Sequence, residues 1–146
     1  MANAQMLADY LFLQELVEAR IAAQIGDQLD VQPINQLEDI AGKNLPRDTV
    51  FVYWDGERIP DDAAGGASTM TQQLYTVLLA KRNARQVKGA LNTSAGPQLS
   101  ALHKAIAGWA PPGAMRPFRR ASAGRRPYYG TNVALYPLTF SISLTL

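Results

Sequence analysis

The spacing of apolar residues predicts an amphipathic helix near the start of the chain, over residues 4–26. The apolar positions recur at intervals of three and four, which places them on one face of a helix. They are Tyr10, Leu13, Leu16, Val17, Ile21 and Ile25. Polar side chains fill the other face, and Gly26 is the expected C-terminal stop. We expect this helix to pack its apolar stripe against a core.

A second helix is predicted to begin at Pro97, because a proline at the first helical position gives up no intrahelical hydrogen bond. One face of this helix carries Leu99, Leu102, His103 and Ile106. The helix is expected to end near Gly108. The preceding segment, residues 83–92, fits either a loop or a helix.

Shorter segments predict strands and turns. Residues 49–54 are β-branched or aromatic and give the clearest strand, and Asp55-Gly56 directly after them predicts a tight turn before a short return at 58–59. Residues 30–35 are expected at a sheet edge, because Pro33 cannot donate a ladder hydrogen bond. A strand is also expected over 118–122. Residues 60–68 are small and polar and predict a flexible loop.

Two longer runs alternate in the way typical of strands with two distinct faces. In residues 70–81 the even-numbered side chains point one way and the odd-numbered side chains the other. Both rows begin polar and become apolar, which indicates an extension that leaves the core at its start. Residues 133–144 alternate similarly, and Pro137 within them implies an edge position or a bulge.

The order of these segments predicts an α+β fold, in which two main helices pack on one face of a mostly antiparallel sheet. The chain has 146 residues, of which 47% are hydrophobic, enough for one domain over 1–146 with a single core. It has no cysteine, which excludes disulfides, thiolate nucleophiles and cysteine-ligated metals. No apolar run reaches membrane-spanning length, and we expect neither a secretory signal nor a membrane partner.

Charge is distributed very unevenly along the chain. All twelve acidic residues lie in the first 62 positions together with four basic residues, which gives this part a formal charge of −8. Residues 63–146 hold ten basic residues and no acid, a formal charge of +10. Surfaces of opposite sign suit head-to-tail contacts between copies, which close into a ring. Alternatively, the two halves fold together and neutralise each other locally.

Two charged clusters are the candidate interface residues. The acidic cluster consists of Asp55, Glu57, Asp61 and Asp62. The basic cluster, in an expected hairpin over about 116–127, consists of Arg116, Arg119, Arg120, Arg125 and Arg126. Arginines interleaved with aromatic residues are typical of nucleic-acid footprints and also of protein–protein interfaces. A hairpin that is merely solvated is a third interpretation.

Residues suited to catalysis are scarce, and we expect no enzymatic activity, catalytic residues, metal or cofactor. His103 is the only histidine, and a lone histidine on such a helix is more often a packing or capping residue than a base. The Gly65-Gly66 loop lacks the lysine and spacing of a phosphate-binding loop. The adjacent carboxylates Asp61 and Asp62 are more simply interpreted as solvated than as a cation site.

Two soft motifs carry a resemblance to a known family. Gly108-Trp109-Ala-Pro-Pro-Gly113 follows the second helix, and Tyr136-Pro-Leu-Thr-Phe140 lies in the last strand, after Tyr128-Tyr-Gly130. With the order of elements, these resemble the small tail-terminator, or tail-completion, proteins of long-tailed bacteriophages, in particular the Mu-like branch. Pro137 and the 60–68 loop depart from the pattern.

This resemblance implies a structural virion protein that is assembled in the host cytoplasm. Such a protein forms a six-membered ring on the tail tube, ends tube polymerisation and joins the tail to the neck. Its implied partners are other copies of itself, the tail-tube protein and the head–tail connector or neck proteins, with DNA passing through the lumen. The alternatives are another neck or head-completion ring protein, or a nucleic-acid-binding module that uses the segment from Arg116 to Arg126.

Overall fold

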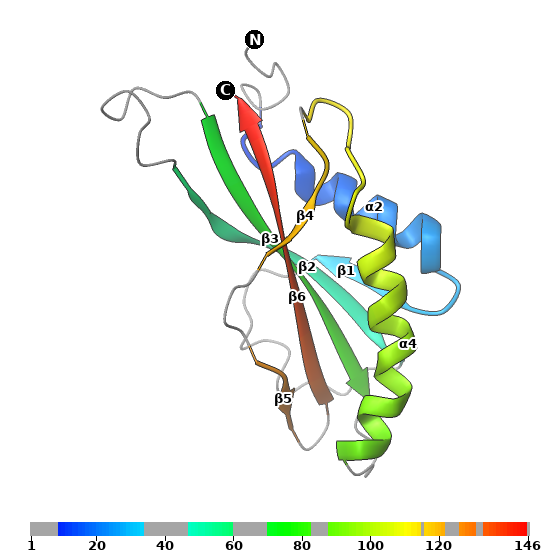
Figure 1. Cartoon of the computed structure of the whole chain (residues 1–146). Helices are drawn as coiled ribbons and strands as arrows, with labels where there is room; N and C mark the ends of the chain where they lie inside the picture. Colours follow the sequence, from blue (N-terminus) through cyan, green and yellow to red (C-terminus); the bar gives the residue numbers. More distant parts are fainter. Residues whose placement is uncertain are drawn as a thin grey trace.

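The computed structural model describes residues 9–33, 47–59, 70–82, 88–114, 116–121, 126–130 and 133–145. These residues form a twisted six-stranded sheet with two helices (Figure 1). The helices are α2 (Leu13–Ile25) and α4 (Lys88–Ile106). The strands are β1 (Asp30–Pro33), β2 (Thr49–Arg58), β3 (Met70–Arg82), β4 (Arg119–Ala121), β5 (Tyr128–Tyr129) and β6 (Val133–Thr145).

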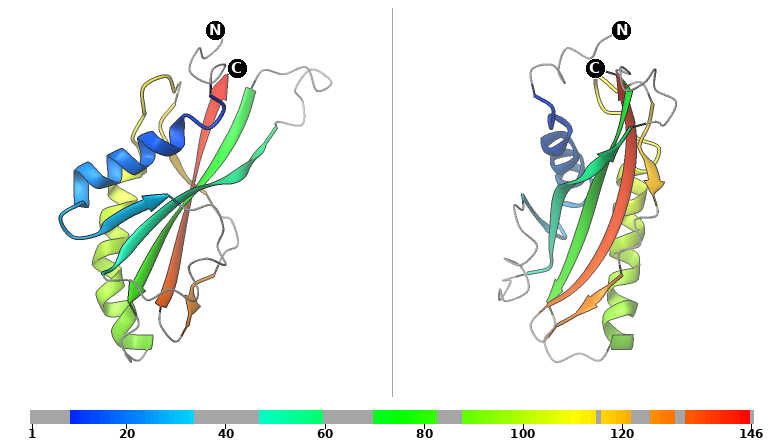
Figure 2. Two further views of the ribbon diagram at one scale, coloured as in Figure 1. Left: turned by 180° about the vertical axis from the view of Figure 1, so that it is seen from behind. Right: turned by 90° about the vertical axis from the view of Figure 1, so that its left-hand side faces the viewer.

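The sheet confirms the predicted α+β class. Its strand order is β1-β2-β3-β6-β4, and β5 also pairs with β6. Only β1 and β2 are parallel to each other, and every other pairing is antiparallel. In the rear view of Figure 2 both helices lie on the same side of the sheet. Side chains from both helices join one sheet face in the main hydrophobic core.

The long strands β3 and β6 have the two faces that their alternation predicts. The pair is continuous from Met70 opposite Thr145 to Arg82 opposite Val133. On β3, Val77 and Leu79 belong to the main core beneath the helices, whereas Leu78 and Ala80 belong to a smaller cluster on the other face. The second face is not covered by either helix.

The prediction that β3 leaves the core at its start is wrong. Thr71 and Gln73 are buried, the latter completely. The segment before α2 supplies a hydrogen-bond acceptor for the buried amide of Gln73, because Gln73 Nε2 donates to the Tyr10 carbonyl oxygen at 2.9 Å. The hydroxyl of Tyr75 donates to Gln73 Oε1 at 2.7 Å, so both ends of the amide are bonded.

The first helix buries most of the predicted stripe and ends before Gly26, but it begins later than expected, and Tyr10 is exposed before its start. Leu13, Val17, Ile21 and Ile25 are its buried residues, and residues 9–12 form a turn rather than helix. Residues 1–8 lie outside the described part. The helix packs against α4, β1 and β2, so the N-terminal elements lie together at one end of the strand order.

The second helix starts at Lys88, and Pro97 is inside it rather than at its beginning. A proline in a helix interior removes one backbone hydrogen bond and commonly breaks the helix. Here the helix continues through Pro97, because residues on both sides of the proline pack into the core. Leu91 and Ala95 before it, and Leu102 after it, are buried in the main core, whereas Pro97 is exposed.

The Asp55-Gly56 pair does not form a hairpin turn, and β2 continues to Arg58. The register against β3 shifts between Trp54 and Glu57, which marks a β-bulge, and Gly56 has a φ of 97° there. The predicted return strand at 58–59 is therefore wrong, because β3 is the strand that returns.

The expectation for Pro137 also needs correction, because the pairing of β3 with β6 shows no register shift and β6 is not an edge strand. Pro137 instead lies in a gap on the other side of β6. There β5 pairs with residues 134–135 and β4 with residues 139–141. The proline thus occupies a stretch where the ladder on that side is interrupted.

Candidate functional site: two surfaces of opposite charge

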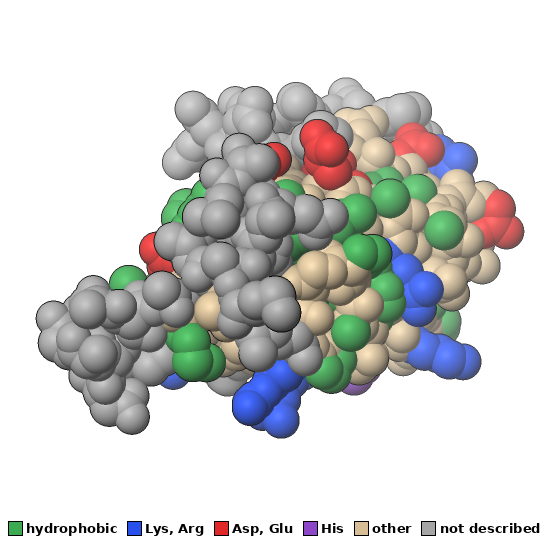
Figure 3. Space-filling model, turned by 90° about the horizontal axis from the view of Figure 1, so that it is seen from above, with side chains coloured by type: hydrophobic (Ala, Val, Ile, Leu, Met, Phe, Trp, Pro, Cys, Tyr) green, Lys and Arg blue, Asp and Glu red, His purple; other side chains and the backbone are tan. Residues whose placement is uncertain are grey.

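The fold turns the charge split along the sequence into a separation in space. The acid-rich first half supplies α2, β1 and β2, whereas β4 with its arginines lies at the opposite end of the strand order. Seen from above, acidic side chains lie mostly in the upper part of the molecule and basic side chains mostly in the lower part (Figure 3). On this face of the molecule, acidic and basic side chains are therefore largely separated.

The acidic face of α2 consists of Glu15 and Glu18 with the flanking Asp9 and Asp27. Among the described residues neither glutamate has an ion pair, whereas Arg47 Nη2 donates to the Asp27 carbonyl oxygen at 3.2 Å. Arg20 is the basic residue on this helix, but its guanidinium lies 5.3 Å from the centre of the Trp109 ring. Its Nε also donates to the Ala105 carbonyl oxygen at 3.0 Å. Arg20 therefore fastens α2 to the end of α4 rather than neutralising the acids.

The arginine groove is a small surface depression beside β4. It is lined by Gln72, Arg116, Pro117, Arg119, Ser141 and Ser143. Arg119 pairs with Ser141 across the strands, so both side chains lie on the sheet face that the helices leave uncovered. The groove offers guanidinium and hydroxyl donors, a set suited to oxyanions such as carboxylates or phosphates.

Charges of the two halves scarcely pair within the described residues. Arg47 and Asp30 form an exposed pair at 3.4 Å inside the first half. Lys81 and Asp48 form a pair at 2.7 Å that joins the halves. Of these two pairs, which lie in the described part of the chain, the second joins the acidic half to the basic half.

The predicted acidic cluster is partly engaged by its own chain. Thr76 Oγ1 donates to Asp55 Oδ2 at 2.8 Å, and the hydroxyl of Thr76 is 2.9 Å from that of Thr139. Glu57 accepts hydrogen bonds from the hydroxyls of Thr71 and Tyr10, which lower the pKa of its carboxyl. Both acids thus support the bulged end of β2, and their role at an interface stays a prediction. Asp61 and Asp62 lie outside the described residues.

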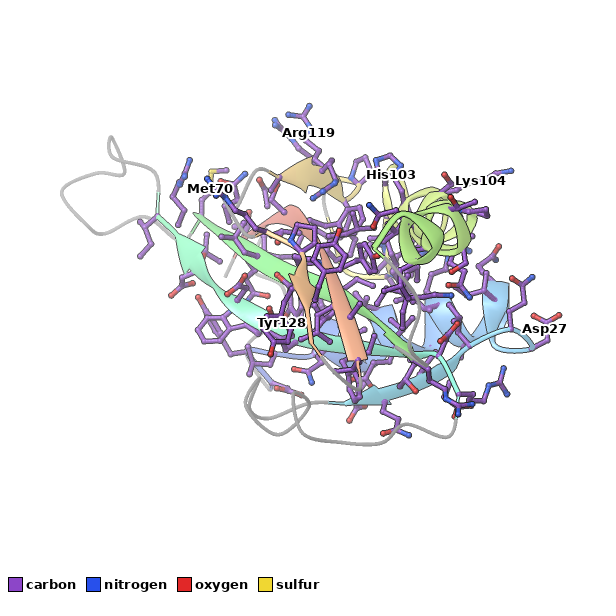
Figure 4. The ribbon with its side chains drawn as sticks, turned by 90° about the horizontal axis from the view of Figure 1, so that it is seen from below. Asp27, Met70, His103, Lys104, Arg119 and Tyr128 are labelled. Carbon is purple, nitrogen blue, oxygen red and sulfur yellow. The ribbon has the colours of Figure 1, made fainter. Side chains whose placement is uncertain are left out.

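The structure separates the predicted arginines. Arg116 and Arg119 meet in the groove, and Figure 4 shows Arg119 pointing away from the molecule. Arg120 turns to the other face of β4, where its Nη1 donates to the carbonyl oxygens of Thr139 and Ala121 at 2.7 and 3.0 Å. Its guanidinium also lies 5.6 Å from the centre of the Phe140 ring.

Two arginines of the predicted basic cluster remain to be placed relative to the arginine groove. Arg126 is exposed just before β5 and does not line it, and Arg125 lies outside the described residues. The strands on either side of the expected basic hairpin, β4 and β5, are each paired with β6. Residues 122–125 between them are also outside the described part.

Sequence reasoning missed Gln72, Ser141 and Ser143 as groove residues, and Glu15 and Glu18 as members of a charged face. The groove residues depend on the register of three strands, which carries no local signal. The acidic face had a detectable signal: both glutamates lie outside the apolar stripe, and neither has a lysine or arginine four residues away.

The described residues contain no group of three or more His, Cys, Asp or Glu side chains that could hold a metal ion. His103 is exposed on α4, with its ring centre 6.0 Å from that of Phe140. In the part of the chain that the structure describes, no helix has the length and apolarity needed to cross a membrane.

Comparison with known proteins adds one finding. The family model described as "Phage tail terminator protein" matches residues 6–146, nearly the whole chain. No curated protein matches the sequence. The match covers both helices and every strand, and hence the acidic face of α2 and the arginine groove.

Proposed function

This chain belongs to the phage tail terminator family and has a structural role in completing the phage tail; from that premise we propose that it forms a six-membered ring that caps the tail tube. The ring ends tube polymerisation and presents its other side to the head-side neck proteins. Assembly takes place in the host cytoplasm, and the finished ring stays in the virion.

The observation that carries this proposal is the unneutralised charge on two different sides of the molecule. A contact between unlike surfaces is heterologous, and its repetition generates either a closed ring or an open filament. A face that needs a cationic partner and a groove that needs an anionic one supply the two halves of such a contact. The scarcity of catalytic groups in the described residues suits a structural part.

A nucleic-acid-binding module is the competing proposal, and the placement of the arginines weakens it. Two of the five predicted arginines share the groove, and a third, Arg120, is engaged by backbone carbonyls. Fewer free cations on one surface mean fewer neutralised phosphates and weaker binding.

The test is to polymerise the tail-tube protein of the same phage with and without this protein. Tube lengths are counted by electron microscopy, and the mass of the added protein is measured before and after mixing. We expect shorter tubes that carry one ring of six copies at an end. An unchanged length distribution with no bound ring contradicts the proposal.

A further inference from the structure

We propose that the acidic face of α2 on one copy docks into the arginine groove of the next copy, and that this is the contact between neighbouring subunits of the ring. The inference rests on the proposed ring and names the surfaces that build it. Its occupant is a second copy of this chain, because the chain itself carries both complementary surfaces.

In the described part of the chain, the two glutamates of α2 have no cationic partner. Glu15 and Glu18 are one helical turn apart, and like charges at this spacing repel each other. Burial of the Glu18 carboxyl raises its pKa, a hydrogen bond from Gln14 offsets this in part, and the charge of Glu15 raises it further. A cationic partner would relieve this repulsion.

The shape of α2 suits close approach by a partner. Ala19, Ala22 and Ala23 are exposed beside the glutamates, so the side chains on this part of the helix surface are small. Small side chains let another backbone come near, while the longer glutamates extend beyond them.

The arginine groove has the complementary hydrogen-bond donors, and strand pairing fixes the positions of the residues that line it. Arg119 and Ser141 are held in register by the pairing of β4 with β6, and Ser143 lies opposite Gln72 in the pairing of β6 with β3. Gln72 Nε2 is 3.4 Å from Ser141 Oγ, which links the polar residues of the groove. The described residues that line the groove include no acid, so Arg116 and Arg119 can bind an anion from a partner. Arginine binds carboxylates through two parallel hydrogen bonds when it is positioned in this way.

The positions of the two surfaces make the contact head-to-tail. The helix α2 packs over β1 and β2, whereas the groove lies beside β4 at the other end of the strand order. In Figure 4, Asp27 after α2 and Arg119 on β4 point outward on different sides of the molecule. After one contact the first copy therefore keeps a free groove and the second copy keeps a free acidic face, and the series continues until it closes. A nucleic acid would fill the groove and leave the acidic face of α2 without a partner.

Charge reversal tests this contact, with tube capping by the wild-type protein as the reference. The variants are E15R/E18R on the helix and R116E/R119E in the groove. Each alone places like charges against each other, so we expect roughly 100-fold more protein to be needed to halve the mean tube length. An equimolar mixture restores capping, because alternating copies recreate an attractive pair at every contact. The matched control K104E reverses an exposed residue of α4 outside both surfaces and caps normally.

Cross-linking provides the second readout, since the chain has no cysteine of its own. The variant A19C/S143C places one thiol on each surface and keeps every charge. On tail tubes under mild oxidation we expect a ladder of cross-linked species that ends at the ring. Neither A19C nor S143C alone gives a ladder.

The outcomes separate this inference from the proposed function. If the wild-type protein does not cap tubes, the proposed function fails. If it caps tubes but both reversed variants cap equally well and A19C/S143C gives no ladder, only the docking inference is overturned. Normal assembly of R116E/R119E with loss of low-salt binding to a DNA duplex assigns the groove to nucleic acid and also overturns it.

Discussion

The Nζ atom of Lys81 lies 2.7 Å from Oδ2 of Asp48, in an ion pair that joins the basic half of the chain to the acidic half. Lys81 is buried, and its Nζ also donates to Gln98 Oε1 at 2.9 Å. The backbone N–H of Arg82 donates to Asp48 Oδ1 at 2.9 Å. The carboxylate therefore connects the start of β2, the end of β3 and α4.

Removing this carboxylate should destabilise the fold. Replacing Asp48 by Ala leaves the Lys81 ammonium buried without its counter-ion, which costs about 3 kcal/mol. Urea denaturation measures this as a lower midpoint with an unchanged slope. The matched control is Asp30→Ala, which removes the exposed pair with Arg47 and should cost less than about 1 kcal/mol. Equal losses in the two variants would contradict the special role of the buried pair.

The same carboxylate should make stability depend on pH in acid. Burial by itself raises the pKa of Asp48, but hydrogen bonds from Lys81, the Arg82 amide and Gln98, with the charge of Lys81, outweigh it and leave the pKa below its ordinary value. A depressed pKa contributes stability that is complete above the unfolded pKa of about 4 and is lost as pH falls through the folded pKa.

The measurement is the free energy of unfolding of the wild-type protein and of Asp48→Asn, from pH 7 down to pH 2. We expect the wild-type protein to lose its advantage over the variant below about pH 4. Taking the difference between the two proteins removes the contributions of Glu57, whose pKa is also lowered, and of Glu18, whose pKa is raised. A difference that stays constant with pH would rule out Asp48 as the titrating group.

Neighbouring arginines on β4 should respond differently to substitution. Arg119 faces the groove, so Arg119→Ala should weaken tube capping and leave the urea midpoint unchanged. Arg120 bonds the carbonyl oxygens of β4 and β6 and lies over Phe140, so Arg120→Ala should lower the free energy of unfolding by about 1 kcal/mol. Its capping should be normal at temperatures where it is folded. The opposite assignment of effects would show that the two side chains have been given the wrong roles.

Periodicity predicted the parts of the fold that depend on burial. The stripe of α2 and the two faces of β3 and β6 follow from apolar side chains at spacings of four and two, and the core contains them as expected. The start of the second helix was harder to predict, because residues 83–92 fitted either a loop or a helix and Pro97 suited a helix start. The preference of proline for the first turn favoured a helix that starts at Pro97. In the structure the helix starts earlier, because Leu91 and Ala95 are buried in the core.

The groove depended on long-range pairing that local patterns do not encode. Arg119 meets Ser141 because β4 adds to β6 in one register, and Arg120 turns away for the same reason, since adjacent strand residues face opposite sides. The charge split along the chain pointed to two surfaces of opposite sign. It did not point to the glutamates of α2, which have no ion pair among the described residues, rather than to Asp55 and Glu57.

The bulge at Gly56 tests whether β2 needs the left-handed conformation at this position. Gly56 has a φ of 97°, and a Cβ built there meets no atom within 4 Å, so Gly56→Ala adds backbone strain and nothing else. The expected loss is about 1–2 kcal/mol. Gly96 lies inside α4 directly before Pro97, whose ring disfavours a Cβ on the preceding helical residue, so Gly96→Ala should not raise stability despite the higher helix propensity of alanine. Urea denaturation of both variants decides the matter: a Gly56→Ala protein as stable as the wild type would mean that the strand does not need the left-handed conformation at its bulge.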